Sequence, residues 1–362
     1  MGTHAQDSAA RTALVIGATG GLGAEVARQL LAHGWQVRAL TRHAEVAAGT
    51  AAAGAVPSGL QGVAWCLGDA LNARDVLQAA RGMRFIVHAA NPPRYTRWRE
   101  LALPMLAHAI EAARAVGARV VLPGNVYNFG PDAGACVDEA SPQHPLTRKG
   151  AVRVEMEQML PAAAHDMAHP VRSLVVRAGD FFGGHAPASW FQTLLVKPGR
   201  ALTRVVYPGE PEVGHAWAYL PDLAATMLRL MELDVADPRA LATCEVLHFG
   251  GHWLPRGIDM AEAVRRAAGV PGLPIRSMPW GVVRWLAPFV RVLREVQEMR
   301  YLWRVPLQLD NAKLRRLLGE EPHTPLEEAV RESLVGLGCL PSMPGGSAGR
   351  GPGAGQARLA TR

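Results

Sequence analysis

Cysteine is scarce in this chain, with four residues among 362 and no two of them spaced as CxxC. A disulfide-stapled secreted fold is therefore not expected, and the thiols should be reduced, as in a cytoplasmic protein. No apolar run free of charge reaches about 18 residues, so no transmembrane helix is expected. The first apolar run, ALVIG from Ala13, leads directly into glycines, so no signal peptide is expected either.

Several functional signatures are also missing. The net charge is +7, which would suit an anionic ligand. There is, however, no dense Lys/Arg run, no zinc-finger spacing and no aromatic RNA-binding signature, so nucleic acid is not an expected partner. No G-x-S-x-G elbow or P-loop lysine motif occurs. His165 and His169 have the spacing of helical zinc ligands but lack the accompanying Glu, and Pro170 should end that helix, so no metal site is expected.

Apolar strand patterns alternate with helical patterns from Ala13 onward, which predicts βαβ units and a parallel sheet with both faces covered. The fold class predicted is α/β, a Rossmann-like doubly wound parallel sheet with a smaller C-terminal substrate-binding lobe. The predicted strands are 13–17, 36–41, 62–68, 84–90, 118–124, 171–178 and 244–249, and the predicted helices are 21–33, 72–81, 99–116, 148–160, 221–233, 256–269, 280–303, 310–318 and 325–337.

The ends of the chain are poor in core-forming residues and are expected to be disordered tails. The sequence divides as follows: tail 1–11, NAD(P)-binding domain 12–183 plus about 213–250, substrate lobe about 184–212 plus 251–340, and tail 341–362. Asp259 is a candidate cap for helix 256–269. The tryptophan-bearing stretch 280–303 is expected to be one long helix bent at Pro288, more consistent with a packed lobe helix than with a membrane or subunit contact.

A glycine-rich loop joins the first strand to the first helix. The segment ALVIGATGGLG places Gly17, Gly20 and Gly23 between an apolar strand and an amphipathic helix. Glycines in that position permit a tight turn and let the backbone approach a pyrophosphate at the helix N-terminus. The strand–turn–helix context therefore predicts a dinucleotide-binding site.

The end of the second strand bears on the choice of cofactor. An NAD-binding domain usually places an acidic side chain there for the ribose 2′-hydroxyl, but this chain has Thr41 followed by Arg42. An arginine accommodates a 2′-phosphate, so NADP is favoured and NAD remains the alternative.

Together these motifs resemble the extended short-chain dehydrogenase/reductase superfamily, the NAD-dependent epimerase/dehydratase group. The resemblance covers roughly 13–338 and includes GATGGLG, LGDALN, HAANPP, NVYNFGP, VRAGDFFGG and HAWAYLPDLAATML. It implies a nicotinamide cofactor, a small-molecule substrate and a possible homodimer. The cofactor-binding residues that it and the glycine loop predict are Gly17, Thr19, Gly20, Gly21, Leu22, Gly23, Arg42, Asp69, Ala70, Ala89, Ala90, Asn91 and Arg153.

The usual catalytic residues of that superfamily are absent. Aligning the family's active helix on Glu157 puts Lys149 at the tyrosine position and Arg153 at the lysine position, and the Ser/Thr position falls on Pro123. The resemblance therefore implies that Arg153 holds the nicotinamide ribose. Lys149 is titratable and is the candidate general acid or base.

Further candidates surround this predicted site. Asn125 and Tyr127 could reach the same cleft, and Tyr127 could supply the missing hydroxyl or could simply be a packing residue. The substrate candidates are Asp180, Phe181, His185 and Trp190, with Phe182, Trp217 and His215 nearby. His88 follows a buried strand and is expected to be buried and hydrogen-bonded.

The function predicted is an atypical NADP-dependent oxidoreductase or epimerase acting on a secondary alcohol or carbonyl. The alternative is a non-catalytic NADP(H)-binding regulator or redox sensor, which the loss of the Ser/Tyr/Lys set favours.

Overall fold

The computed structural model describes residues 11–52, 54–92, 97–184 and 189–341. Its centre is a seven-stranded sheet in the order β3-β2-β1-β4-β5-β7-β11, in which all six pairings are parallel. This is the strand order of a Rossmann fold extended by one strand. The strands are β1 (Thr12–Ile16), β2 (Gln36–Thr41), β3 (Ala64–Leu67), β4 (Phe85–His88), β5 (Arg119–Asn125), β7 (Ser173–Ala178) and β11 (Cys244–His248).

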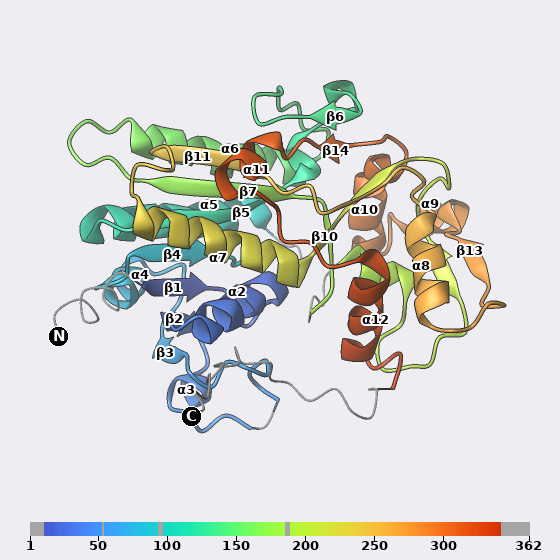
Figure 1. Ribbon diagram of the computed structural model, residues 1–362, viewed down its shortest axis with the longest axis horizontal. Coiled ribbons are helices and arrows are strands. Elements are labelled where there is room, and N and C mark those ends of the chain that lie inside the picture. The colour runs from blue at the N-terminus through green and yellow to red at the C-terminus, as the bar shows by residue number, and fades with distance from the viewer. Residues whose placement is uncertain (1–10, 53, 93–96, 185–188, 342–362) are drawn as a thin grey trace, which may run out of the picture.

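Helices cover both faces of this sheet (Figure 1). On one face lie α2 (Gly21–Ala32) and α7 (Leu220–Ala236), and on the other lie α4 (Ala73–Ala80), α5 (Trp98–Val116) and α6 (Arg148–Ala164). Within β1 the side chains alternate, because Val15 belongs to the first core and Leu14 to the second. The predicted α/β doubly wound fold is confirmed.

A smaller, aromatic-rich set of elements lies beside the sheet, to the right in Figure 1, and has its own core around Phe182, Trp217 and Trp303. Its strands pair as β12-β10-β8, β13-β9 and β14-β6.

The remaining strands and α-helices of the described chain are β6 (Cys136–Val137), β8 (Asp180–Phe182), β9 (Val205–Tyr207), β10 (His215–Tyr219), β12 (His252–Leu254), β13 (Ile275–Ser277), β14 (Gln308–Leu309), α3 (Ala44–Ala47), α8 (Asp259–Ala267), α9 (Trp280–Leu286), α10 (Arg291–Glu298), α11 (Ala312–Leu318) and α12 (Leu326–Gly336).

Two sequence predictions about this region were wrong. Stretch 280–303 is not one helix: α9 ends at Leu286, α10 starts at Arg291, and 299–303 form a 3-10 turn. Pro288 separates the two because it has no N–H to donate and its ring obstructs the preceding turn. Asp259 does not cap α8; it is the first helical residue, and Ile258 stands at the cap position without a side-chain hydrogen bond.

The four cysteines form no disulfide. Within the described residues, no helix is long and apolar enough to cross a membrane, and no cluster of His, Cys, Asp or Glu could hold a metal. Residues 1–10 and 342–362, which make up most of the predicted tails, lie outside the described residues.

Candidate active site

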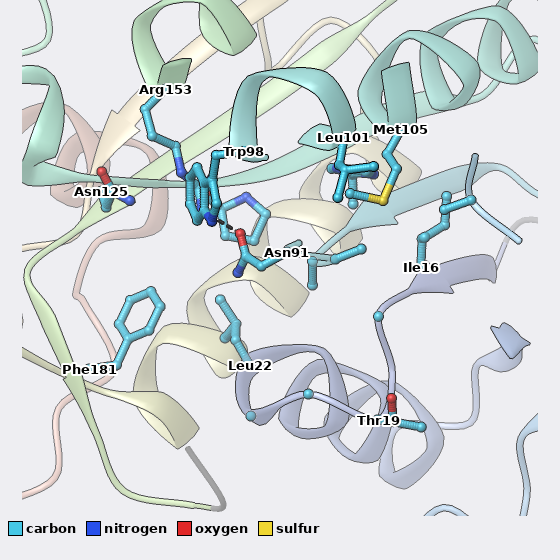
Figure 2. A pocket seen from close by; sticks show the side chains of 18 of the residues that line it. Ile16, Thr19, Leu22, Asn91, Trp98, Leu101, Met105, Asn125, Arg153 and Phe181 are labelled. Carbon is cyan, nitrogen blue, oxygen red and sulfur yellow. Dashed lines mark hydrogen bonds between the residues drawn. The ribbon is translucent and has the colours of Figure 1, made fainter. Parts of the chain in front are cut away.

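A cavity of about 790 Å³ opens where β1, β2, β4 and β5 end at their carboxyl edge (Figure 2). This is the crevice in which open parallel sheets bind their ligands, and its volume is typical of a small-molecule site. The predicted residues that line it are Gly17, Thr19, Gly20, Gly21, Leu22, Arg42, Asp69, Ala70, Ala89, Ala90, Asn91, Asn125, Tyr127, Lys149, Arg153, Asp180, Phe181 and Trp190.

The glycine loop is packed too tightly for a side chain at two of its positions, Gly17 and Gly23. Gly17 has a φ of +93°, and a Cβ built on it would lie 2.7 Å from the backbone nitrogen of Ala90. A Cβ on Gly23 would lie 2.2 Å from the carbonyl oxygen of Gly17. Helix α2 begins at Gly21 with neither a side-chain cap nor an acidic residue in its first turn. These features fit a phosphate group at the helix N-terminus.

The ends of β2 and β3 bring predicted cofactor-binding residues to the cavity. Thr41 is buried, and its hydroxyl accepts a hydrogen bond of 3.2 Å from the backbone N–H of His43. Arg42 is exposed and lines the cavity. Asp69 also lines it, and one carboxylate oxygen of Asp69 accepts a 2.9 Å hydrogen bond from the backbone N–H of Leu71. A cation and no carboxylate therefore follow β2 at the cavity.

His88, at the end of β4, differs from its prediction. It is buried as expected, but neither ring nitrogen has a hydrogen-bond partner among the described residues. Burial, reinforced by the nearby charge of Arg153, lowers its pKa to about 4. The imidazole is therefore neutral at pH 7 and lines the cavity with an unsatisfied donor and acceptor. A ligand that reaches His88 could satisfy either one.

Arg153 lies on α6 and is held at the cavity wall by groups from three neighbouring segments, the loop after β4, strand β5 and helix α5. Its guanidinium donates to the side-chain oxygen of Asn91 at 2.7 Å and to the carbonyl of Pro123 at 3.4 Å. The same group lies over the ring of Trp98, 5.1 Å from its centroid, and Figure 2 shows the three side chains converging. A permanent cation is thus fixed where the family resemblance places the ribose-holding lysine.

Lys149 lies one turn earlier on α6. It is 8 % exposed and lines the cavity. The helix starts there because the Thr147 hydroxyl accepts the N–H of Gly150 at 3.0 Å. The side-chain oxygen of Asn125 forms a local hydrogen bond, because it accepts the backbone N–H of Tyr127 at 3.0 Å.

Only some of the predicted substrate-contacting residues lie at the cavity. Asp180, Phe181 and Trp190 line the cavity, whereas His185 lies outside the described residues. Phe182 and Trp217 do not line it, because they are fully buried against each other in the core of the smaller lobe. Sequence reasoning missed Trp98, Leu101 and Met105 of α5, as well as Ser189, Thr193, Val296 and Met299. The one feature of the sequence that could have indicated Trp98, Leu101 and Met105 is that they lie in the first turns of the helix after the fourth-strand loop.

Residues 17–145 match a family model described as NAD(P)H-binding. No curated protein sequence gives a significant match to the chain. Among solved structures, a UDP-glucose 4-epimerase from Thermotoga maritima superposes with a TM-score of 0.67 at 15 % identity, covering 90 % of this chain and 98 % of that one. A dTDP-glucose 4,6-dehydratase from Streptomyces venezuelae superposes with a TM-score of 0.63 at 18 % identity, covering 89 % and 95 %.

The chain shares the fold of these nucleotide-sugar epimerases and this dehydratase. The resemblance inferred from its motifs is confirmed at this level, and the glycine loop lies within an NAD(P)H-binding segment. A third neighbour, a UDP-N-acetylglucosamine 4-epimerase from Methanobrevibacter ruminantium, superposes with a TM-score of 0.68 at 12 % identity, covering 90 % of this chain and 97 % of that one. Identities this low establish the fold alone.

Proposed function

We propose that the protein is an NADP-dependent oxidoreductase or epimerase of the atypical short-chain dehydrogenase/reductase type. Its substrate would be a small molecule carrying a secondary alcohol or a carbonyl. The observation that carries this proposal is that the glycine loop, through Gly17, Gly20 and Gly21, lines the same cavity as Lys149 and Arg153, whereas Gly23 lies behind the loop. A dinucleotide in this cradle of loop glycines would extend toward those two cations.

NADP is proposed over NAD on the residues after β2. Thr41 offers no carboxylate for a ribose 2′-hydroxyl, and Arg42 provides a guanidinium suited to a phosphate. NAD stays the alternative, because the superposed dTDP-glucose 4,6-dehydratase has NAD bound.

The proposed chemistry assigns separate tasks to this chain's residues. A bound nicotinamide would supply or accept a hydride at its C4 position. Arg153 would hold the ribose, with Asn91 and Trp98 fixing the guanidinium. Lys149 and Tyr127 line the wall where a proton must be exchanged with the substrate oxygen. Asp180, Phe181 and Trp190 would contact the substrate, and His185 remains a candidate.

Replacing Lys149 with Ala tests catalysis separately from binding. The variant should keep the NADPH affinity of the wild type and lose about 100-fold or more in turnover, the usual scale for a lost proton-transferring or charge-stabilising group. The readout is NADPH consumption with a panel of aldehydes and ketones, alongside NADPH binding by fluorescence. Lys197→Ala, which removes an exposed lysine outside the cavity, is the control.

The alternative, a non-catalytic NADP(H)-binding regulator, makes the opposite prediction. Wild type would then bind NADPH tightly, consume none of it with any carbonyl compound, and be indistinguishable from Lys149→Ala. A homodimer and a cytoplasmic location remain predictions of the sequence.

A further inference from the structure

The smaller lobe exposes a cluster of large apolar side chains on α9 and on the turn that follows it. Four of the nine large apolar side chains that are exposed in the described part of the chain lie here. They are Val282, Trp285, Phe289 and Val290, which are exposed by 54 %, 72 %, 80 % and 41 %. We call these four residues the apolar patch. Exposed apolar side chains that gather in one place commonly mark a binding surface.

Helix α9 is apolar on two faces, and the lobe covers only one of them. Val283 and Ala287, four residues apart, are buried in the lobe. Three of the patch residues follow the three- and four-residue spacing of the opposite face. The backbone keeps this spacing past the end of α9, because the N–H of Val290 donates to the carbonyl oxygen of Leu286 at 2.9 Å. A helix that is apolar on both faces is normally buried on both, so the second face needs a partner.

The patch is held in a fixed position on the lobe. The indole N–H of Trp280, at the start of α9, donates to the carbonyl oxygen of Pro208 at 2.8 Å. The guanidinium of Arg300 lies over the Trp280 ring, 4.7 Å from its centroid. In the turn after α9, the guanidinium of Arg294 donates to the carbonyl oxygen of Pro288 at 3.0 Å. The exposed side chains therefore extend from an anchored element.

The charged residues around the patch are all of one sign. Between Glu262 and Glu295 the chain has six arginines and no acidic residue. Arg276, Arg284 and Arg294 are exposed, and no described carboxylate forms an ion pair with any of the three. Arg294 lies directly beside the patch, because Pro288, whose carbonyl it contacts, lies between patch residues. This side of the lobe therefore presents apolar side chains bordered by positive charge.

The patch also adjoins a helix that forms part of the cavity wall. Helix α9 packs against α10, and Val296 of α10 lines the cavity together with Met299 just after it. Both helices lie in the smaller lobe, to the right in Figure 1. A surface docked on the patch would therefore lie next to the helix that bounds the cavity.

An anionic lipid surface fits these features better than another protein does. Aromatic side chains are favoured at the membrane–water interface, and arginines near an anionic surface add attraction. A second copy of the chain, related by a two-fold axis, would place the arginines of one patch against those of the other. Protein partners usually enclose aromatic side chains in pockets. Trp285 and Phe289 instead protrude, as side chains that insert between lipids must.

We propose that the apolar patch and its arginines dock the protein peripherally on anionic membranes. With 7 residues, α9 is too short to span a bilayer and would lie in the interface. The sequence favoured a packed lobe helix for 280–303, and the exposed second face of α9 is the observation that changes this interpretation. The docking does not depend on the proposed enzymatic function.

Cosedimentation of the full chain with sucrose-loaded vesicles tests the proposal. Wild type should pellet with vesicles made of an equal mixture of phosphatidylcholine and phosphatidylglycerol, and should bind about tenfold or more weakly to phosphatidylcholine alone. Raising the salt from about 0.1 M to about 1 M should also weaken binding, because it shortens the Debye length. Wild type that stays in the supernatant with both vesicles, or that binds both equally, would overturn the proposal.

A double variant tests the apolar contribution. Trp285→Ala combined with Phe289→Ala should weaken binding to the mixed vesicles about 100-fold, roughly tenfold for each large apolar side chain kept out of the bilayer. The matched control, Leu67→Ala combined with Met167→Ala, removes two exposed apolar side chains outside the patch and should bind as wild type does. Equal binding by the two double variants would show that the patch does not contact lipid.

A triple variant tests the electrostatic contribution. Arg276→Gln, Arg284→Gln and Arg294→Gln in one chain should weaken binding to the mixed vesicles about tenfold or more. The control changes three exposed arginines outside the patch, Arg74, Arg81 and Arg239, to glutamine. It alters the net charge equally and should have less than about a threefold effect, since distant charges are screened. Equal losses in the two triple variants would refute a role for the patch arginines.

Analytical ultracentrifugation without lipid tests the competing occupant, a second copy of the chain. The wild type and the variant lacking Trp285 and Phe289 should have the same oligomeric state. A wild-type dimer that this variant converts to a monomer would assign the patch to self-association and would contradict membrane docking.

Discussion

Arg153 and Glu157 show how one helix serves both the cavity and the sheet. Arg153 is held at the cavity by Asn91, whereas the Glu157 carboxylate is buried against Arg177, with a shortest separation of 2.7 Å. Asn128 also donates to Glu157, and Arg177 contacts Nε2 of His248 at 3.1 Å. Removing one partner of such a buried pair usually costs several kcal/mol, so the Glu157–Arg177 contact fixes α6 relative to β7. The glutamate on which the sequence was aligned with the family it resembles therefore has a structural role in this protein.

Gly23→Ala tests the cofactor cradle at the residue scale. The added Cβ would lie 2.2 Å from the Gly17 carbonyl oxygen, a backbone atom that cannot move without opening the loop. Overpacking of this kind costs about 1–3 kcal/mol, so NADPH affinity should fall about tenfold or more. Gly336→Ala, where an added Cβ meets nothing within 4 Å, should bind as wild type does. Equal fluorescence titrations for the two variants would contradict the assignment of the cradle.

Individual residues also show where sequence reasoning stopped. It predicted cavity-lining positions for the loop glycines, Arg42, Lys149 and Arg153, and all of these except Gly23 line the cavity, because short motifs report backbone turns and fixed spacings within one helix. It named Asp180, His215 and Tyr127 separately but could not pair them, since only the alignment of β8 with β10 brings Asp180 and His215 together. It expected a hydrogen-bond partner for His88, and no described residue supplies one.

At the element scale, α6 positions Lys149 and Arg153, two of the cations that line the cavity. Thr147 caps its first turn, and a carboxylate oxygen of Glu298 on α10 accepts the backbone N–H of Arg148 at 2.7 Å. These two acceptors satisfy N–H groups that a helix N-terminus otherwise leaves open. They also offset the unfavourable electrostatic free energy of placing Arg148, Lys149 and Arg153 near the positive end of the helix dipole.

Thr147→Ala should therefore destabilise the protein by about 0.5–2 kcal/mol, the usual cost of losing a capping hydroxyl. The free energy of unfolding is measured in urea. Thr147→Ser keeps the hydroxyl and should retain most of the stability. If alanine and serine at this position were equally stable, the cap would contribute nothing.

Element prediction succeeded where periodicity was regular and failed where it was interrupted. Every predicted strand of the main sheet is present within a few residues of its expected ends. The segment 280–303 carried enough apolar residues to suggest one helix, but Pro288 divides it, and Trp285 and Phe289 remain exposed. A helical pattern indicates which residues could share one face of a helix. It does not show whether the helix is continuous between them.

At the scale of the whole molecule, buried histidines make stability depend on pH. Burial lowers the pKa of His88, His248 and His252 to about 4 each, with nearby positive groups adding to the effect. The unfolded chain, with histidine pKa values near 6.5, binds more protons between about pH 4 and 6.5. The stability that these neutral rings contribute is therefore fully present above pH 6.5 and is lost as pH falls toward 4.

Urea unfolding at pH 7.5 and pH 5.5 measures this loss, which should approach about 1.4 kcal/mol per pH unit for each histidine once the pH is well below 6.5. His252→Gln should reduce the slope, and His169→Gln, at an exposed position, should leave it unchanged. A free energy of unfolding that is the same at both pH values would contradict the burial of neutral histidines.

The central claim, that the cavity binds NADP through the glycine loop and Arg42, is tested most directly by fluorescence titration of the purified protein with NADPH and with NADH. NADPH should bind more tightly, and Arg42→Ala should weaken NADPH about tenfold while leaving NADH unchanged, as expected for one lost charged hydrogen bond. Arg74→Ala, which removes an exposed arginine outside the cavity, controls for net charge. Equal affinity for the two cofactors would contradict the role of Arg42, and binding of neither by folded protein would contradict the account as a whole.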